Sequence, residues 1–302
     1  MFPIIGANTV SAAFPENEEG IVMGGNVSGY VSMSNLISDA GVVSTDVTGV
    51  ASVRSHFAGC EYGDDKGIFA YGINTSGKLS ASNLVSNVGV VATDTTGVGT
   101  NRSAVGACAY DEDKGIFGYG HIASPAGSVS MSNLVSNVGV VATDTSGVGT
   151  ARDELTATEY GGDKGIFGFG IAGGSGNSSI TNLVSNSGVI ASDTTGVGSA
   201  RGSPGACGYG GDKGIFAYGS GNVSMSNLVS NAGVVSTDVT GVGSGRKASS
   251  ACEYGGDLGI IAFGYISSNT AVSNLVSDSG VVSSDVSGVG SARRYSTACS
   301  FN

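Results

Sequence analysis

The hydrophobic and polar positions of this chain form short runs separated by glycine-rich turns. Between Arg152 and Gly198 the apolar positions fall into four runs, at about 155–160, 166–170, 180–185 and 188–193. The first two runs flank Gly161-Gly162-Asp163-Lys164-Gly165, which is typical of a tight hairpin because glycine adopts positive φ without steric cost. The pattern therefore predicts four short antiparallel strands.

This pattern recurs six times along the chain. The Asn-Leu pair that opens the third run begins at Asn35, Asn83, Asn133, Asn182, Asn227 and Asn274. The successive spacings are 48, 50, 49, 45 and 47 residues, a period typical of propeller blades. No segment keeps a 3.6-residue apolar period for three turns, and glycine interrupts most stretches of ten residues. We therefore expect an all-β chain.

The repeat is offset from the ends of the chain. The last residues, Ala298-Cys299-Ser300-Phe301, match the first run of a repeat, and a degenerate second run, Glu18-Glu19-Gly20-Ile21-Val22, stands near the start. We expect a six-bladed β-propeller with four antiparallel strands per blade, closed when the C-terminal strand, about 295–301, joins the blade formed by residues 18–50. The predicted blades of this single domain, 18–302, are 18–50 with 294–302, 54–99, 102–149, 152–198, 201–243 and 246–290. Residues 1–17 lack the repeat and are predicted to form an N-terminal arm.

The order of residues within each repeat resembles the kelch repeat. An Arg opens the unit, and Ile-Phe-Gly-Tyr-Gly, a variable loop, Asn-Leu-Val-Ser and Val-Val-Ala-Thr-Asp follow. Over about 280 residues, this resemblance implies a β-propeller that serves as an interaction module. The chain departs from the kelch pattern because its glycine doublet is split as Gly-x-Gly and because it contains no Trp.

Two nearly invariant phrases are also similar to repeat proteins of tailed bacteriophages, marine and cyanobacterial ones especially. They are Gly-Val-Val-Ala-Thr-Asp-Thr-Thr-Gly-Val-Gly and Asp-Lys-Gly-Ile-Phe-Gly-Tyr-Gly. This resemblance implies a virion protein, such as a tail fibre or a capsid decoration, that is assembled in the host cytoplasm and carried on the extracellular particle. The implied partners are other virion proteins, or a glycan or protein of the host surface, and an oligomer is compatible with such a role.

The charge of the chain narrows its partners. It has 24 acidic and 13 basic residues, a net charge of −11, and therefore lacks the clustered cations that bind a phosphate backbone. We expect no nucleic acid partner. No run of about 18 apolar residues occurs, so we expect no membrane insertion. Charged residues make up only 12%, about half the usual share, which favours an uncharged polar partner or another protein.

The five cysteines occupy one equivalent position of the repeat, with Thr158 at the sixth: Cys60, Cys108, Cys207, Cys252 and Cys299. Equivalent positions in a ring of blades lie too far apart to be bridged, so we expect buried free thiols and no disulfide framework. No Cys-x-x-Cys or Cys-His spacing predicts a zinc site.

Two charged positions also recur in every repeat, an Asp followed eight residues later by an Arg. The aspartates are Asp46, Asp94, Asp144, Asp193, Asp238 and Asp285, and the arginines are Arg54, Arg102, Arg152, Arg201, Arg246 and Arg293. Six copies favour a structural role, in which the Asp caps its turn and the Arg ties neighbouring strands. The alternative is structural calcium, which carboxylates beside glycine-rich turns bind. We predict no other metal and no cofactor.

Catalytic constellations are missing from the sequence. The only histidines, His56 and His121, fall in loops of different repeats with no nucleophile nearby. Glu154 and Glu159 are the one pair that resembles the carboxylates of a glycan hydrolase. We therefore expect a protein that is not an enzyme.

The variable positions are the best candidates for binding. One set of variable loops follows each Arg, and the other joins the second and third runs, whereas the runs themselves differ little. Loops on a rigid scaffold are where binding residues accumulate, although neutral drift explains the same variation. The candidate binding residues are His56, Phe57, His121, Asp153, Glu154, Tyr265, Arg294 and Tyr295.

These observations favour a non-enzymatic phage virion protein, structural or adhesive, that binds protein or glycan through face loops. The alternatives are a propeller-type glycan hydrolase, or depolymerase, and a cellular kelch-type interaction module.

Overall fold

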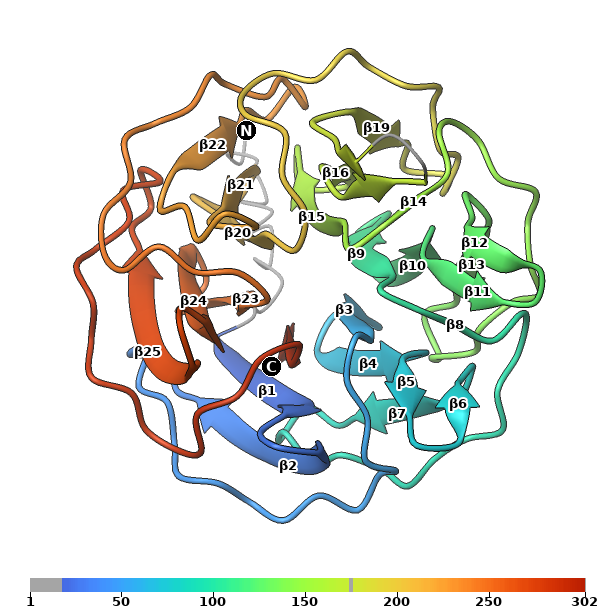
Figure 1. Ribbon diagram of the computed structural model, residues 1–302, viewed down its shortest axis with the longest axis horizontal. Coiled ribbons are helices and arrows are strands. Elements are labelled where there is room, and N and C mark those ends of the chain that lie inside the picture. Colours follow the sequence, from blue (N-terminus) through green and yellow to red (C-terminus); the bar gives the residue numbers. More distant parts are fainter. Residues whose placement is uncertain (1–17, 174–175, 302) are drawn as a thin grey trace, which may run out of the picture.

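The part of the chain that the structure describes consists of β-strands and loops. The computed structural model describes residues 18–173 and 176–301, and no helix occurs among them, so nothing in these ranges forms a helix that could cross a membrane. The predicted arm, residues 1–17, lies outside the described residues. Figure 1 shows the small sheets arranged around a common centre in chain order.

Five repeats each form a three-stranded antiparallel sheet in which the middle strand pairs with both others. In the first of these, β3 (Ala58–Tyr62) is innermost, β4 (Lys66–Ala70) is central and β7 (Ser82–Val85) is outermost. The equivalent strands of the other four sheets are β9 (Gly106–Tyr110), β10 (Lys114–Gly118) and β13 (Ser132–Val135); β15 (Thr156–Tyr160), β16 (Lys164–Gly168) and β19 (Thr181–Val184); β20 (Gly205–Tyr209), β21 (Lys213–Ala217) and β22 (Ser226–Val229); and β23 (Ser250–Tyr254), β24 (Leu258–Tyr265) and β25 (Asn269–Val276).

A sixth sheet is built from both ends of the chain. β1 (Glu19–Asn26) pairs with β2 (Tyr30–Ile37) on one side and with β26 (Thr297–Phe301) on the other. Ile21 lies opposite Cys299 in this pairing, and Figure 1 shows β26 near the centre beside β1. β26 also contacts β23 and β3, the innermost strands of the sheets before and after it.

In three repeats, the second variable loop forms a short hairpin beside the residues that follow the Arg. β11 (His121–Ala123) lies between β12 (Ala126–Ser128) and β8 (Arg102–Ser103). β17 (Ile171–Ala172) lies likewise between β18 (Gly176–Asn177) and β14 (Arg152–Asp153). β5 (Ile73–Asn74) and β6 (Gly77–Lys78) form a two-stranded hairpin, and Ile73 bridges to Ser55. The two variable loop sets are therefore neighbours in space.

The fourth strand predicted in each repeat is not formed, and the sheets have three strands. The fourth run joins the third strand only through isolated bridges, such as Val85 to Val91 and Ser82 to Thr95. Ser82 and Val85 are three residues apart on the third strand, whereas their partners Val91 and Thr95 are four residues apart on the fourth run. The fourth run therefore contains one extra residue, which interrupts the ladder. Asn83 Nδ2 also donates to Ala92 O at 3.0 Å, which gives that carbonyl a side-chain partner.

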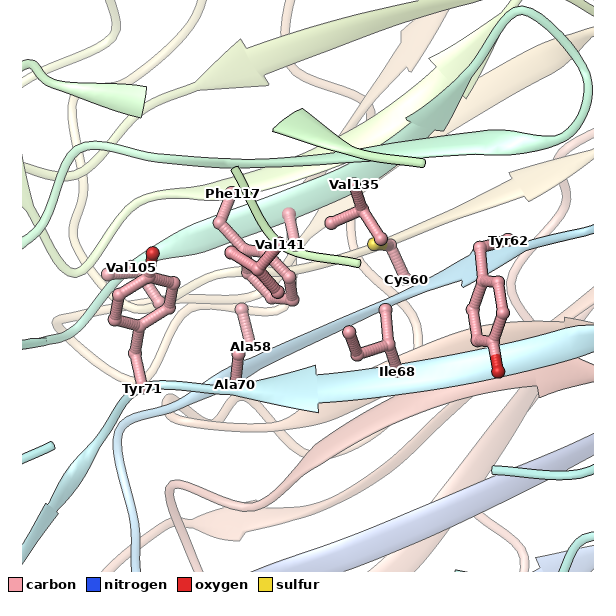
Figure 2. Close-up of a cluster of buried hydrophobic side chains, with 11 residues drawn as sticks. Ala58, Cys60, Tyr62, Ile68, Ala70, Tyr71, Val105, Phe117, Val135 and Val141 are labelled. Atoms are coloured by element: carbon pink, nitrogen blue, oxygen red, sulfur yellow. The ribbon is translucent and has the colours of Figure 1, made fainter. Parts of the chain in front are cut away.

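The core lies between neighbouring sheets. Figure 2 shows Ile68 and Tyr71 of one sheet on the side facing Phe117 and Val135 of the next, and all four side chains are fully buried. Tyr71 and Phe117 pack edge to face with ring centroids 5.4 Å apart. The five cysteines occupy the same interfaces, where all are buried and free, as predicted.

Candidate functional site

Five of the six repeat-opening arginines begin a chain of hydrogen bonds that fixes where the innermost strand starts. Arg152 is fully buried, and its Nη2 donates to Asn182 Oδ1 at 2.5 Å. Asn182 Nδ2 donates to Asp193 Oδ1 at 2.9 Å. Asp193 also accepts from the N–H of Thr150 at 3.0 Å and from its hydroxyl at 2.6 Å. The side chain of Asp193 thus ties the linker that enters the sheet to the outermost run of that sheet.

The other repeats carry equivalent contacts. In each of the six, the Asp accepts from an Asn at 2.8–3.0 Å and from a Ser or Thr two residues before the Arg. Arg246 is the exception among the arginines, because its Nη2 donates to the backbone carbonyl of Ile261 at 2.9 Å instead of to an Asn side chain. The sequence predicted a local turn cap for these aspartates, whereas these partners lie far away along the chain.

The environment of these groups supports a structural role. Arg102 lies over the Tyr71 ring, 4.3 Å from its centroid, which offsets some of the cost of burying a cation. Burial alone would raise the pKa of the Asp94 carboxyl, but hydrogen bonds from Ser52 and Asn83 and the charge of Arg54 hold that pKa below its usual value. These carboxylates are already engaged by protein donors. Among the described residues, no three His, Cys, Asp or Glu side chains are placed to hold a metal ion.

Two residues after each Arg, the backbone adopts the left-handed conformation at a residue that is not glycine. The six φ angles lie between 50° and 56°, at His56, Ala104, Glu154, Ser203, Ala248 and Tyr295. This conformation costs an L-residue roughly 1–2 kcal/mol, and the chain uses none of its 53 glycines at these positions.

These six residues are joined by backbone hydrogen bonds into one cycle. Each N–H donates to the carbonyl of the equivalent residue in the preceding repeat, with N···O distances of 2.7–3.1 Å. His56 N donates to Tyr295 O, so the cycle returns to its start across the two ends of the chain. We call this cycle and the opening that it surrounds the mouth.

A cavity of about 100 Å³ opens at the mouth. It is lined by the six residues of the cycle and by the first residues of the innermost strands that follow them. The first variable loop set, which the sequence divided among six repeats, therefore surrounds a single cavity.

The side chains around the mouth are arranged as two unlike pairs. His56 and Tyr295 are stacked, with ring centroids 3.6 Å apart and an interplanar angle of 22°. Glu154 and Ser203 form the other pair, in which the Ser203 hydroxyl donates to the Glu154 carboxylate. Along the backbone, Ala104 lies between the pairs on one side of the cycle and Ala248 on the other, but a side-chain hydrogen bond between Tyr295 and Ser203 links the two pairs.

Burial and nearby charges keep the two stacked aromatic side chains of the mouth uncharged at neutral pH. Burial, together with the positive charges of Arg294 and Lys78, lowers the pKa of His56 to about 4, so this imidazole is neutral at pH 7. Burial and the Glu154 carboxylate raise the pKa of Tyr295, so its phenol keeps its proton. The mouth therefore combines two uncharged aromatic groups with one carboxylate.

Comparison of the chain with protein-family models and with curated proteins finds no match. The chemistry of the mouth is therefore interpreted from its own geometry. Its order of residues, aromatic, small, acidic, hydroxyl, small and aromatic, breaks the six-fold repetition of the scaffold.

Five of the eight predicted binding residues lie elsewhere or only beside the mouth. Phe57 also lines the cavity, but its side chain is buried and packs edge-on against Phe69 with centroids 5.9 Å apart. His121 accepts from Lys78 Nζ through its backbone carbonyl at 2.9 Å. The other three are half-buried on the adjoining loops: Asp153 accepts from Ser128 Oγ at 2.8 Å, and Arg294 lies over Tyr265 at 4.7 Å from the ring centroid.

A second group of equivalent residues lies farther along the innermost strands, and apart from Glu159 it was missed in the sequence. The fourth residue of the innermost strands alternates between Glu and a small residue, in the order Glu61, Ala109, Glu159, Gly208, Glu253 and Ser300. All of them except Ala109 line a cavity of about 50 Å³. Alternation at this single repeat position was the available signal.

The small residues make room for the glutamates. Glu159 accepts from Ala109 N at 3.3 Å, and a side chain on Gly208 would collide with the Glu253 carboxylate. Burial raises the pKa of Glu61, and burial together with the charge of Glu61 raises the pKa of Glu159 to about 8. At neutral pH, Glu159 is therefore largely protonated.

Proposed function

We propose that the chain is a six-bladed β-propeller closed by its two ends, and that it is a non-enzymatic structural or adhesion protein of a phage virion. In this proposal, it binds glycan or protein through the loops around the mouth. Six equivalent sheets support the architecture, as do the contacts of each innermost strand with the next and the return of the hydrogen-bonded cycle from Tyr295 to His56.

The arrangement of the variable loops carries the proposal of binding. The loops that differ between repeats gather beside one opening, and their backbones pair with one another, as His121 does with Ser103 and Lys247 with Tyr265. The rest of each repeat is a nearly constant scaffold. A rigid scaffold with diverse loops on one face is a common basis for recognition.

The virion role is supported by the resemblance of the two repeat phrases to phage repeat proteins. Mass spectrometry of purified phage particles tests it, together with binding of the labelled full chain to intact host cells. We expect the chain in the particles and saturable binding to host cells. Presence of the chain in uninfected cells, and its absence from particles, would favour the cellular interaction module.

The geometry of the carboxylates disfavours a hydrolase. Glu154 lines the mouth and Glu159 lines the deeper cavity, and the part of β15 from Thr156 to Glu159 alone spans about 10 Å. Glycosidases require about 5–9.5 Å. Glu61 and Glu159 line the same cavity, but its volume of about 50 Å³ has room for only about two water molecules.

An assay of polysaccharide cleavage tests this choice. The full chain is incubated with host polysaccharide, and new reducing ends are measured. We expect none above background. If the chain releases reducing ends and this activity disappears in Glu154→Gln or Glu159→Gln, the protein is a depolymerase and the proposal is wrong.

A further inference from the structure

We infer that the mouth binds one neutral sugar at the end of a glycan chain. This inference deepens the proposed function and rests on it for its biological setting. It is carried by the two unlike pairs of side chains, by the charges around them and by the size of the cavity.

The backbone at the mouth is strained, as it also is at buried core aromatics such as Tyr71 and Phe169. The left-handed conformation is retained at six positions where glycine would adopt it without strain. Four of these positions carry a polar or aromatic side chain: His56, Glu154, Ser203 and Tyr295. Backbone strain of this kind clusters at binding sites, where the surrounding structure holds it in place.

The two pairs match the two kinds of surface that a sugar presents. Neighbouring hydroxyls of a sugar are donors that one carboxylate can accept together, as Glu154 already accepts from Ser203. The C–H face of the sugar ring is apolar and packs against aromatic rings such as those of Tyr295 and His56.

The charges near the mouth oppose one another. An anion would be repelled by the Glu154 carboxylate and attracted by Arg294 and Lys78, whose charges reach His56, and an ammonium group would meet the reverse, so neither sign of charge is clearly favoured. A ligand without charge, whose hydroxyls both donate and accept hydrogen bonds, satisfies all of these groups.

The size of the cavity limits how much of a glycan it holds. A volume of about 100 Å³ corresponds to roughly three water molecules. The cavity therefore takes part of one sugar ring, with the rest of the chain directed outward over the variable loops. This geometry selects a terminal sugar over an internal one.

The inference is tested by binding of methyl glycosides of glucose, galactose, mannose and N-acetylglucosamine to the full chain, followed by saturation-transfer NMR and calorimetry. We expect at least one glycoside to bind. Glu154→Gln is expected to weaken that binding at least tenfold, because a neutral amide replaces the charged acceptor and one acceptor oxygen becomes a donor. Ala104→Asn narrows the mouth and is expected to weaken binding as well. Asn is a suitable replacement because it tolerates the left-handed conformation that Ala104 adopts.

Glu112→Gln is the matched control, because it removes the same charge from the exposed turn between β9 and β10. It should leave glycoside affinity unchanged, and all variants should melt like the unaltered chain. The inference is overturned if no glycoside binds, if Glu154→Gln and Ala104→Asn bind normally, or if inorganic phosphate or methylammonium binds more tightly.

Host-cell binding separates this inference from the proposed function. If the chain binds host cells and Glu154→Gln binds them equally well, the mouth is not the recognition site, yet the virion role stands. If glycosides bind the mouth but the chain is absent from particles, the virion role fails and the sugar site stands.

Discussion

Asp46 accepts hydrogen bonds from the backbone N–H of Ser291 at 2.9 Å and from its hydroxyl at 2.6 Å, although 245 residues separate the two in the chain. In the other repeats, the same contact joins residues only 39 to 44 apart. Arg293 Nη2 likewise donates to Asn35 Oδ1 at 2.6 Å. The first and last parts of the chain are thus joined by the contacts that organise every internal repeat.

Deleting residues 294–302 should destabilise the whole domain. The deletion removes β26 and uncovers Ile21 and Val22, which are fully buried on the strand that β26 pairs with. We expect the melting temperature to fall by more than about 10 °C, since several kcal/mol of burial are lost at roughly 2–4 °C per kcal/mol. Deleting residues 1–14 is the control. If both truncations melt like the intact chain, the proposed closure is wrong.

Asp46→Asn should cost at least as much stability as Asp193→Asn. Each substitution keeps the shape but weakens charge-assisted hydrogen bonds, by about 1–2 kcal/mol for a partly exposed group. Asp193 and Thr150 are 43 residues apart in the chain, whereas Asp46 and Ser291 are 245 residues apart. The chain therefore keeps Asp46 and Ser291 together less effectively once their hydrogen bonds are weakened. Denaturant unfolding measures both variants. A neutral Asp46→Asn beside a destabilising Asp193→Asn would show that the chain ends are not held in this way.

Phe57→Ala should be more destabilising than Val105→Ala at the equivalent position. Gly24 stands where other repeats have an aromatic residue such as Tyr71, and Phe57 fills that space, 4.9 Å from the Arg54 guanidinium. Losing a buried Phe costs about 3–5 kcal/mol, whereas Val105→Ala removes fewer atoms and leaves Tyr71 beside Arg102. Equal losses in the two variants would contradict this assignment of Phe57.

Glu159 should make the free energy of unfolding decrease as the pH rises from about 6.5 to about 8, whereas below about 6.5 the lowered pKa of His56 acts in the opposite direction. The Glu159 carboxyl has its pKa raised to about 8 in the fold by burial and by Glu61, against 4.5 ordinarily, so the unfolded chain releases this proton at lower pH than the folded chain. Chemical denaturation across this range measures the slope. Glu159→Gln should flatten it, and an unchanged slope in that variant would assign the effect to other groups.

The five thiols should react only after unfolding. All five cysteines are buried, and burial is the largest of the causes that raise their pKa values, as for Cys108 and Cys207. A colorimetric thiol reagent should label fewer than one thiol per native chain and five in denaturant. Rapid labelling of the native chain would mean that the interfaces between sheets open readily.

The hairpins and the repeat period of the fold could be predicted from the sequence. The hairpin between β15 and β16 follows from Gly161-Gly162-Asp163, because its glycines supply positive φ at Gly161 and Gly162. The period and the equivalent cysteines predicted equivalent sheets with buried thiols. The fourth strand was overpredicted, because alternating apolar residues cannot reveal that the bridges at Val91 and Thr95 are one residue out of step.

The sequence by itself determined an all-β chain built from repeated antiparallel hairpins, because turn chemistry and apolar period act between neighbouring residues. Only the tertiary structure decided that His56 stacks on Tyr295, that Phe57 fills the space at Gly24, and that glutamates and small residues alternate around one channel. Each of these relationships joins different repeats. They depend on how six sheets pack around one centre, which the pattern within a single repeat does not contain.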